Sequence, residues 1–376
     1  MNLSDLSLST ATISTDKLIA NVNAFRGLLE PSTKFMAVIK ANAYSHGSVV
    51  LAEVMEEAGV ADFFGVAQLR EAIELREAGI ETPILVFNSV RLTEVAFAIE
   101  NHLTMTVFSK EVAKEVVRVA EELDVEARVH LKIDSGMARL GVTTFDEALT
   151  VYHALKSPNV LVEGIYTHFA EATDVSTENF THEQFAHFNA IIDLFGMHDV
   201  QFDIRHSCNT AGTLNFPNYH LDMVRVGLGL YGMNPNPNGE IQIDLQPVER
   251  VNTTVTHVKD FPAGESIGYD RTYTSDSTMK VATIAIGYAD GVAKSLSNKG
   301  YFTYKGHKLP ILGAVCMDQI MLDSSEVPDL AVGDEVTYFG DPRDGDLLMT
   351  KVAAVAGDSQ YDLLCRVGNR VNRVYN

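Results

Sequence analysis

Short apolar runs alternate with segments of helical periodicity between residue 35 and about residue 227. The helical segments, which include residues 51–59, 110–124 and 181–196, repeat apolar side chains at spacings of three and four. Strands that alternate with amphipathic helices are typical of βαβ units in a parallel sheet. We therefore predict a strand at each of eight apolar runs: 35–40, 62–67, 83–87, 105–108, 127–133, 162–169, 202–206 and 223–227.

Eight such repeats predict an α/β fold built on a (β/α)8 barrel of the TIM type. An open, doubly wound sheet shares the same alternation, and periodicity alone leaves it as the alternative. A further helix over residues 14–30 precedes the first strand and would pack outside it, with Ser14 or Thr15 as its N-cap.

Beyond Pro235 the pattern changes to runs of β-branched residues that are broken by Gly, Pro and Asp. A chain of 376 residues is long enough for two domains. We assign residues 1–234 to the barrel and residues 235–376 to a mainly β C-terminal domain, with NPNPNG at 234–239 as the linker.

The composition is that of a globular protein, with 46% hydrophobic and 21% charged residues. A formal net charge of −21 disfavours nucleic acid and anionic membrane as partners, because both require patches of Lys and Arg. The three cysteines, Cys208, Cys316 and Cys365, form no CxxC pair, so we expect neither a disulfide framework nor a metal site. The sequence has no signal-peptide pattern and no membrane-span-length apolar run, so we expect a cytoplasmic protein.

Polar residues gather where the predicted strands end, which is where TIM-type barrels place their chemistry. They are Lys40 after the first strand, Arg139 after the fifth, His168 at the end of the sixth, HSCNTAG (206–212) after the seventh and RVGLGLYG (225–232) at the eighth. Most strand-end lysines simply reach solvent. At a barrel mouth, however, partial burial would help Lys40 to lose its proton and act as a Schiff-base nucleophile.

The segments CNTAG and VGLG indicate a phosphate site. Backbone N–H groups and the Thr210 hydroxyl could bind an anion, while the glycines let the main chain approach it closely. A reactive lysine beside a phosphate site fits a pyridoxal-phosphate enzyme, and it fits equally a cofactor-free aldolase acting on a sugar phosphate. Composition and spacing leave both open.

The motifs themselves resemble those of alanine racemases, which are pyridoxal-phosphate enzymes of fold type III. The resemblance covers nearly the whole chain and rests on AVIKANAYSHG, LKIDSGMARLG, GIYTHF, NTAGTL, DMVRVGLGLYG, GYDRTY, IGYADG and GAVCMDQIMLD in that order. It implies Lys40, Tyr269, His168 and Arg225 as catalytic residues. It also implies Tyr44, Asn209, Thr210, Gly227, Leu228 and Tyr361, with Lys40 and Arg225, as cofactor-binding residues, and Arg139, Met317 and Tyr288 as substrate-binding residues.

By the same resemblance, Lys40 and Tyr269 are bases on opposite faces of the substrate α-carbon. The partner subunit of a homodimer supplies Tyr269 and Met317, and His168 connects Tyr269 to Arg225. Arg225 faces the pyridine nitrogen of the cofactor. The implied reaction interconverts L-alanine and D-alanine, and it would supply D-alanine for cell-wall peptidoglycan.

Two residues depart from the family pattern: Ser45 and Asp270 stand where glycine is usual. Lys132 matches a lysine that some family members carbamylate. Three alternatives stay open: a racemase for serine or lysine, a barrel that binds pyridoxal phosphate without turnover, and a decarboxylase of the same fold type that would use Cys316 and Asp318.

Overall fold

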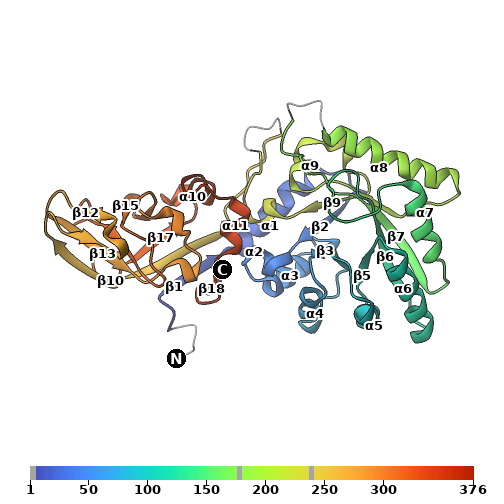
Figure 1. Cartoon of the computed structure of the whole chain (residues 1–376), viewed down its shortest axis with the longest axis horizontal. Helices are drawn as coiled ribbons and strands as arrows, with labels where there is room; N and C mark the ends of the chain where they lie inside the picture. The colour runs from blue at the N-terminus through green and yellow to red at the C-terminus, as the bar shows by residue number, and fades with distance from the viewer. Residues whose placement is uncertain (1–5, 176–179, 237–240) are drawn as a thin grey trace.

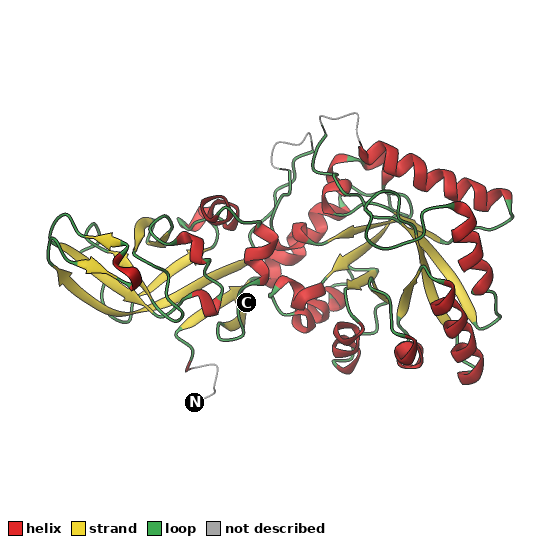
Figure 2. Ribbon diagram, in the orientation of Figure 1, coloured by secondary structure: helices red, strands yellow, loops and turns green. Residues whose placement is uncertain are grey.

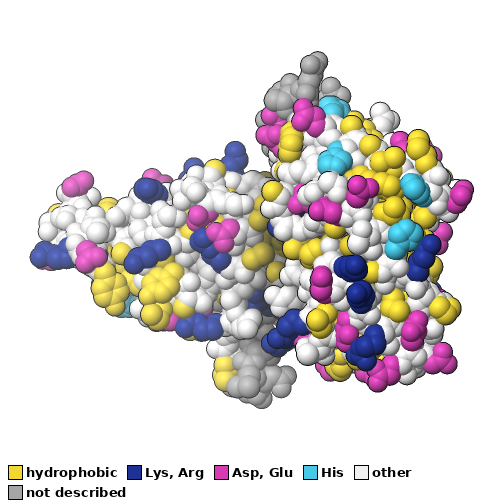
Figure 3. Space-filling model, turned by 45° about the vertical axis from the view of Figure 1, so that its right-hand side comes forward, with side chains coloured by type: hydrophobic (Ala, Val, Ile, Leu, Met, Phe, Trp, Pro, Cys, Tyr) yellow, Lys and Arg dark blue, Asp and Glu magenta, His cyan; other side chains and the backbone are white. Residues whose placement is uncertain are grey.

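The computed structural model describes residues 6–175, 180–236 and 241–376. The chain forms two lobes, a rounded barrel and a narrower domain of long strands (Figures 1 and 3). Within the described ranges, no helix is long and apolar enough to cross a membrane.

The larger lobe is the predicted barrel, and each predicted apolar run overlaps one of its strands. All neighbouring strands are parallel, in the order β8-β7-β6-β5-β4-β3-β2-β9. Between β8 and β9 the backbone N–H of Arg225 donates to the carbonyl of Cys208 at 3.0 Å, which nearly closes the barrel. The strands are β2 (Lys34–Val38), β3 (Phe63–Val66), β4 (Ile84–Val86), β5 (Thr104–Val107), β6 (Ala127–Lys132), β7 (Val160–Tyr166), β8 (Ile204–His206) and β9 (Met223–Val226).

Helices surround the barrel strands, as Figure 2 shows. The expected helix over 14–30 is α1 (Thr15–Arg26); Ser14 is its N-cap residue, but its side chain makes no capping hydrogen bond. The Thr15 hydroxyl instead donates to the carbonyl of Asn376 at 2.8 Å. The others are α3 (Ser48–Glu57), α4 (Leu69–Glu77), α5 (Val95–Glu100), α6 (Lys110–Leu123), α7 (Phe145–Ala154), α8 (Phe180–Met197) and α9 (Thr210–Asn215).

The smaller lobe is mainly β, as predicted. Its larger sheet has the strand order β13-β16-β15-β14-β17-β10-β1-β18. Its elements are β10 (Glu249–Phe261), β11 (Ser266–Ile267), β12 (Tyr273–Thr274), β13 (Met279–Ile284), β14 (Tyr301–Tyr304), β15 (His307–Leu312), β16 (Ile320–Asp323), β17 (Glu335–Phe339), α10 (Met349–Ala356), α11 (Gln360–Cys365) and β18 (Asn372–Tyr375).

The N-terminal strand β1 (Ser9–Ile13) belongs to this second sheet, although we assigned residues 1–234 to the barrel. It pairs antiparallel with β10 and parallel with β18. A five-residue strand carries no sequence signal for its partners, because pairing across more than 230 residues depends on the tertiary fold. The linker expected at 234–239 lies partly outside the described residues.

The backbone after Lys40 makes an unusual left-handed turn, α2 (Lys40–Tyr44). The five residues from Ala41 to Ser45 have φ between +51° and +73°. Side chains with a Cβ disfavour this conformation by about 1–2 kcal/mol per residue, so surrounding contacts must hold the turn in place.

Contacts from both domains supply that support. In the barrel, the carboxylate of Glu71 accepts the N–H of Ala41 at 2.6 Å. From the second domain, the guanidinium of Arg373 donates to the carbonyl of Ser45 at 3.0 Å, and the Ser45 hydroxyl donates to the carbonyl of Cys365 at 3.0 Å. A Cβ on Gly47 would lie 1.9 Å from the Tyr375 hydroxyl, so the two domains meet tightly here.

Both departures from the family pattern lie at left-handed positions, with φ of +73° at Ser45 and +56° at Asp270. Glycine adopts this conformation without steric cost, which explains its usual presence at such positions. At Ser45 the hydrogen bond to Cys365 offsets part of the strain.

We predict that the two smallest replacements of Ser45 differ in stability. Ser45→Ala keeps the strain and loses the hydrogen bond, which should lower the free energy of unfolding by about 1 kcal/mol. Ser45→Gly loses the same bond but relieves about 1 kcal/mol of strain, so it should melt at a higher temperature than Ser45→Ala.

Ala58→Gly is the matched control, because Ala58 is exposed and right-handed with φ of −74°. There the same change to glycine should lower the melting temperature. A Ser45→Gly variant that melts at or below Ser45→Ala would contradict strain at this position.

Candidate active site

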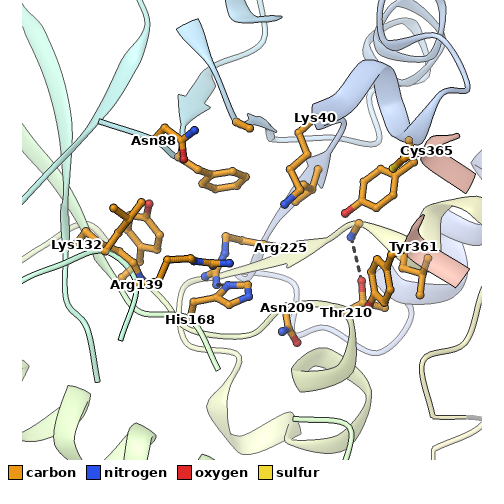
Figure 4. A pocket seen from close by; sticks show the side chains of 18 residues that line it. Lys40, Asn88, Lys132, Arg139, His168, Asn209, Thr210, Arg225, Tyr361 and Cys365 are labelled. Carbon is orange, nitrogen blue, oxygen red and sulfur yellow. Dashed lines mark hydrogen bonds between the residues drawn. The ribbon is translucent and has the colours of Figure 1, made fainter. Parts of the chain in front are cut away.

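A cavity of about 510 Å³ opens at the carboxyl ends of the barrel strands, facing α11 of the second domain. Figure 4 shows side chains from both domains pointing into it. It brings together most of the residues that the sequence singled out: Lys40, Tyr44, Arg139, His168, Asn209, Thr210, Arg225, Gly227, Leu228 and Tyr361.

Lys40 enters this cavity directly after β2. Burial lowers the pKa of its amine, and the positive charge of Arg139 lowers it further, against the opposing attraction of Glu71. Glu71 also fixes the adjacent backbone, since its carboxylate accepts the N–H groups of Ala41 at 2.6 Å and Ala67 at 2.7 Å. Lys40 therefore precedes a fixed stretch of backbone, and its amine loses its proton more readily than that of an exposed lysine.

A cradle of hydroxyl and backbone groups lies beside Lys40. The Thr210 hydroxyl accepts the N–H of Gly227 at 3.0 Å, which leaves its own O–H free to donate (Figure 4). A Cβ on Gly227 would lie 2.6 Å from the Tyr44 hydroxyl, so only glycine leaves this space open. Asn209 caps α9 by accepting the N–H of Gly212 at 2.9 Å.

The barrel side of the cavity is strongly cationic. Arg225 is buried, and burial lowers its pKa to about 10, so it stays protonated near neutrality. Its guanidinium lies 3.3 Å from Nδ1 of His168. Burial, with the positive charges of Arg225 and Lys132, holds the pKa of His168 well below its ordinary value. His168 is therefore held in its neutral form, and the positive charge of the surrounding side chains favours an anionic ligand.

Lys132 lies on the same side, with its amine 4.6 Å from the centre of the Tyr166 ring. Burial and the charge of Arg225 lower the pKa of Lys132 well below that of an ordinary lysine; Asp134 opposes the shift and Arg139 adds to it. The Lys132 amine is therefore held in an environment that favours its neutral form.

Three predicted residues lie elsewhere, in the second domain. The side chains of Tyr269, Tyr288 and Met317 are 71%, 42% and 51% exposed and line no part of this chain's own cavity. Two of their segments adjoin, since the N–H of Tyr288 donates to the carbonyl of Cys316 at 3.0 Å. Within one chain, then, the structure separates these residues from Lys40.

The cavity also contains residues that we did not single out, notably Asn88, Tyr166 and Cys365. Asn88 follows β4, so the rule that placed the other strand-end residues could have found it. Cys365 comes from α11, one turn after Tyr361. Its place at the cavity depends on how the two domains pack, for which the sequence carries no signal.

Comparison with known proteins agrees with this geometry. The family described as alanine racemase, N-terminal domain, matches residues 13–235, and the one described as alanine racemase, C-terminal domain, matches residues 248–375. Alanine racemase 2 of Oceanobacillus iheyensis is 42% identical over 363 residues, which are 96% of this chain and 92% of that protein. The alanine racemase of Methanococcus maripaludis is 39% identical over 357 residues, 94% of this chain and 95% of that protein.

Solved structures lead to the same family. The alanine racemase of Clostridium difficile 630 superposes with a TM-score of 0.93 at 34% identity, covering 99% of this chain and 96% of that one. Sequence, fold and cavity therefore agree that the chain belongs to the alanine racemase family.

Proposed function

We propose that this chain interconverts L-alanine and D-alanine with pyridoxal phosphate bound in the barrel cavity and with two bases, Lys40 and Tyr269 of the partner subunit. The observation that carries the proposal is the position of Lys40. Its amine has a lowered pKa and shares one cavity with the Thr210 and Tyr44 hydroxyls and the buried Arg225 guanidinium.

The residues present fit this cofactor. A readily deprotonated amine suits its aldehyde, and the cradle of Tyr44, Thr210 and Gly227 offers donors to a phosphate in a space that a Cβ would fill. Arg225 can only donate hydrogen bonds, so it suits an unprotonated ring nitrogen. Tyr361 and Asn209 border the same space.

Bound pyridoxal phosphate supplies an electron sink that acidifies the substrate α-hydrogen. Lys40 would then take or return a proton on one face of the α-carbon. Because Arg225 would leave the ring nitrogen without a proton, the sink would be a weak one, which would favour quick return of the proton to the α-carbon. Arg139 is the cation that would orient the substrate carboxylate.

The second base must come from outside this chain's cavity. Tyr269, Tyr288 and Met317 leave large side chains exposed on the second domain, as expected for a surface that another molecule covers. In a head-to-tail homodimer with two-fold symmetry, each second domain would cover the other subunit's cavity. Tyr269 of the partner subunit would then face Lys40 across the substrate.

Lys132 is suited to carbamylation, as the family resemblance implies. Its neutral amine would add carbon dioxide, forming an N–C bond and releasing one proton. The new carboxylate would then lie beside Arg225 and Arg139, the cations that lower the pKa of the Lys132 amine. That carboxylate could then orient Arg139.

We further infer a cytoplasmic enzyme whose D-alanine enters peptidoglycan.

Variants of the two proposed bases should separate their roles. Lys40→Ala should abolish cofactor attachment and turnover of both enantiomers. Tyr269→Phe should retain the yellow cofactor but lower net conversion at least about 100-fold, because one proton-transfer group is gone. We assign the face that L-alanine presents to Tyr269 and the opposite face to Lys40, so solvent exchange of the α-hydrogen in this variant, followed by NMR in D₂O, should persist for D-alanine and be lost for L-alanine.

Tyr301→Phe is a suitable control, because that tyrosine lies on β14, a strand that carries none of the proposed docking residues. It should match the unmodified protein in both assays. Normal turnover by Tyr269→Phe would mean that the second base is another residue.

Mixed dimers test whether the active site is shared. Neither the Lys40→Ala nor the Tyr269→Phe homodimer has a complete site. Coexpressed in equal amounts they form heterodimers, each with one complete site, so about a quarter of full activity should return if the partner supplies Tyr269. Absence of recovery in a purified heterodimer would place both bases in one subunit.

A further inference from the structure

A chain of buried polar side chains runs through the barrel from Arg225 to Glu163. The Arg225 guanidinium lies 3.0 Å from Nδ1 of His206, and Nε2 of His206 lies 2.9 Å from Nδ1 of His130. Nε2 of His130 in turn lies 3.4 Å from Oε2 of Glu163. The chain thus passes from β9 through β8 and β6 to β7.

The donors and acceptors give this chain one direction. A guanidinium only donates, so Nδ1 of His206 accepts and its proton resides on Nε2. That proton is donated to Nδ1 of His130, whose own proton must then reside on Nε2 and face the carboxylate of Glu163. The assignment requires both histidines to be neutral. Burial lowers the pKa of each, and it outweighs the opposing effect of Glu163 on His130; the charge of Arg225 lowers both further.

The barrel interior is shaped around this chain. His130 and His206 are fully buried, and the His206 ring stacks on Tyr166 with centroids 4.6 Å apart. A Cβ on Gly164 would lie 2.8 Å from the His130 ring, so glycine makes room for it. Such packing leaves each imidazole little freedom to turn.

Among the described residues, the acceptors around Arg225 are neutral: the carbonyls of Thr167 and Ser207, with His168 and His206. Glu163 is the carboxylate at the far end. It also accepts from Arg128 at 3.1 Å and borders a second cavity of about 340 Å³ at the opposite end of the barrel. The other charged or titratable residues lining that cavity are Arg76, Glu81, His102, Glu126 and Arg128.

We infer that Glu163 is a positioning residue for Arg225, acting through the fixed tautomers of His130 and His206. The carboxylate orients His130, His130 orients His206, and the lone pair of His206 then holds one guanidinium nitrogen. The guanidinium N–H groups that make no hydrogen bond to the described residues are left for a ligand in the cavity that Arg225 lines, where, on the proposed function, they would meet the cofactor ring nitrogen.

Glu163→Gln tests the inference directly. An amide has one carbonyl oxygen, for which Arg128 and His130 would compete, and its NH₂ group would face Nε2 of His130 in part of the population. That arrangement reverses both imidazoles and turns an N–H of His206 toward Arg225. Glu126→Gln is the matched control, because Glu126 also pairs with Arg128, at 3.0 Å, and the charge change is identical.

Two readouts are needed, and the first uses no turnover. In ¹⁵N NMR of the cofactor-free protein, both histidines should carry their proton on Nε2, and Glu163→Gln should add signals of the reversed tautomers. In the second, Glu163→Gln should weaken pyridoxal-phosphate binding and lower kcat about fivefold each, with less change in KM. Glu126→Gln should leave all of these unchanged.

Glu163→Asp keeps the charge and both acceptor oxygens, so it should retain the original tautomers more fully than Glu163→Gln. Protons on Nδ1 in the unmodified protein would overturn the inference, as would unchanged spectra and cofactor affinity in Glu163→Gln. If Glu163→Gln fails to fold, the tautomers of the unmodified protein and of Glu163→Asp decide whether the inference holds. If NMR shows the expected tautomers but the protein does not racemise alanine, the proposed function is refuted while the inference about the histidine chain still holds.

Discussion

The left-handed turn after Lys40 is the constraint on which this structure depends. Five consecutive residues with side chains hold a conformation that each disfavours by about 1–2 kcal/mol. Such a turn persists only where other contacts fix it, and here Glu71 supplies them from the barrel while Arg373 and Cys365 supply them from the second domain. The backbone turn that follows Lys40 therefore depends on both domains, although the lysine itself belongs to the barrel.

A second constraint is electrostatic. Lys40, Lys132, Arg139 and Arg225 border one cavity, and burial lowers the pKa of three of them, Lys40, Lys132 and Arg225. Mutual repulsion in a poorly solvated space favours anionic ligands and the neutral forms of lysine and histidine. A phosphate, a substrate carboxylate and a carbamate would each relieve this repulsion between cations. Ligand binding and proton transfer therefore depend on the same arrangement of charges.

The sequence predicted the features that depend on local pattern. Periodicity located the eight barrel strands, and the strand-end rule located Lys40, His168 and Arg225 at one cavity. It could not predict the pairing of β1 with β10, the left-handed turn or the place of Cys365, because these depend on contacts between distant segments. The sequence placed His130 inside a predicted strand and His206 at the end of another, in HSCNTAG, but gave neither a role; only the barrel places them in one hydrogen-bonded chain.

The measurement that tests the account most directly is incubation of the cofactor-loaded protein with L-alanine in D₂O. The two-base account predicts D-alanine that carries deuterium at the α-carbon, because the proton removed on one face is replaced from solvent on the other. D-alanine that retains the substrate hydrogen throughout would contradict two separate bases. An unchanged L-alanine pool beside a bound yellow cofactor would contradict alanine as the substrate.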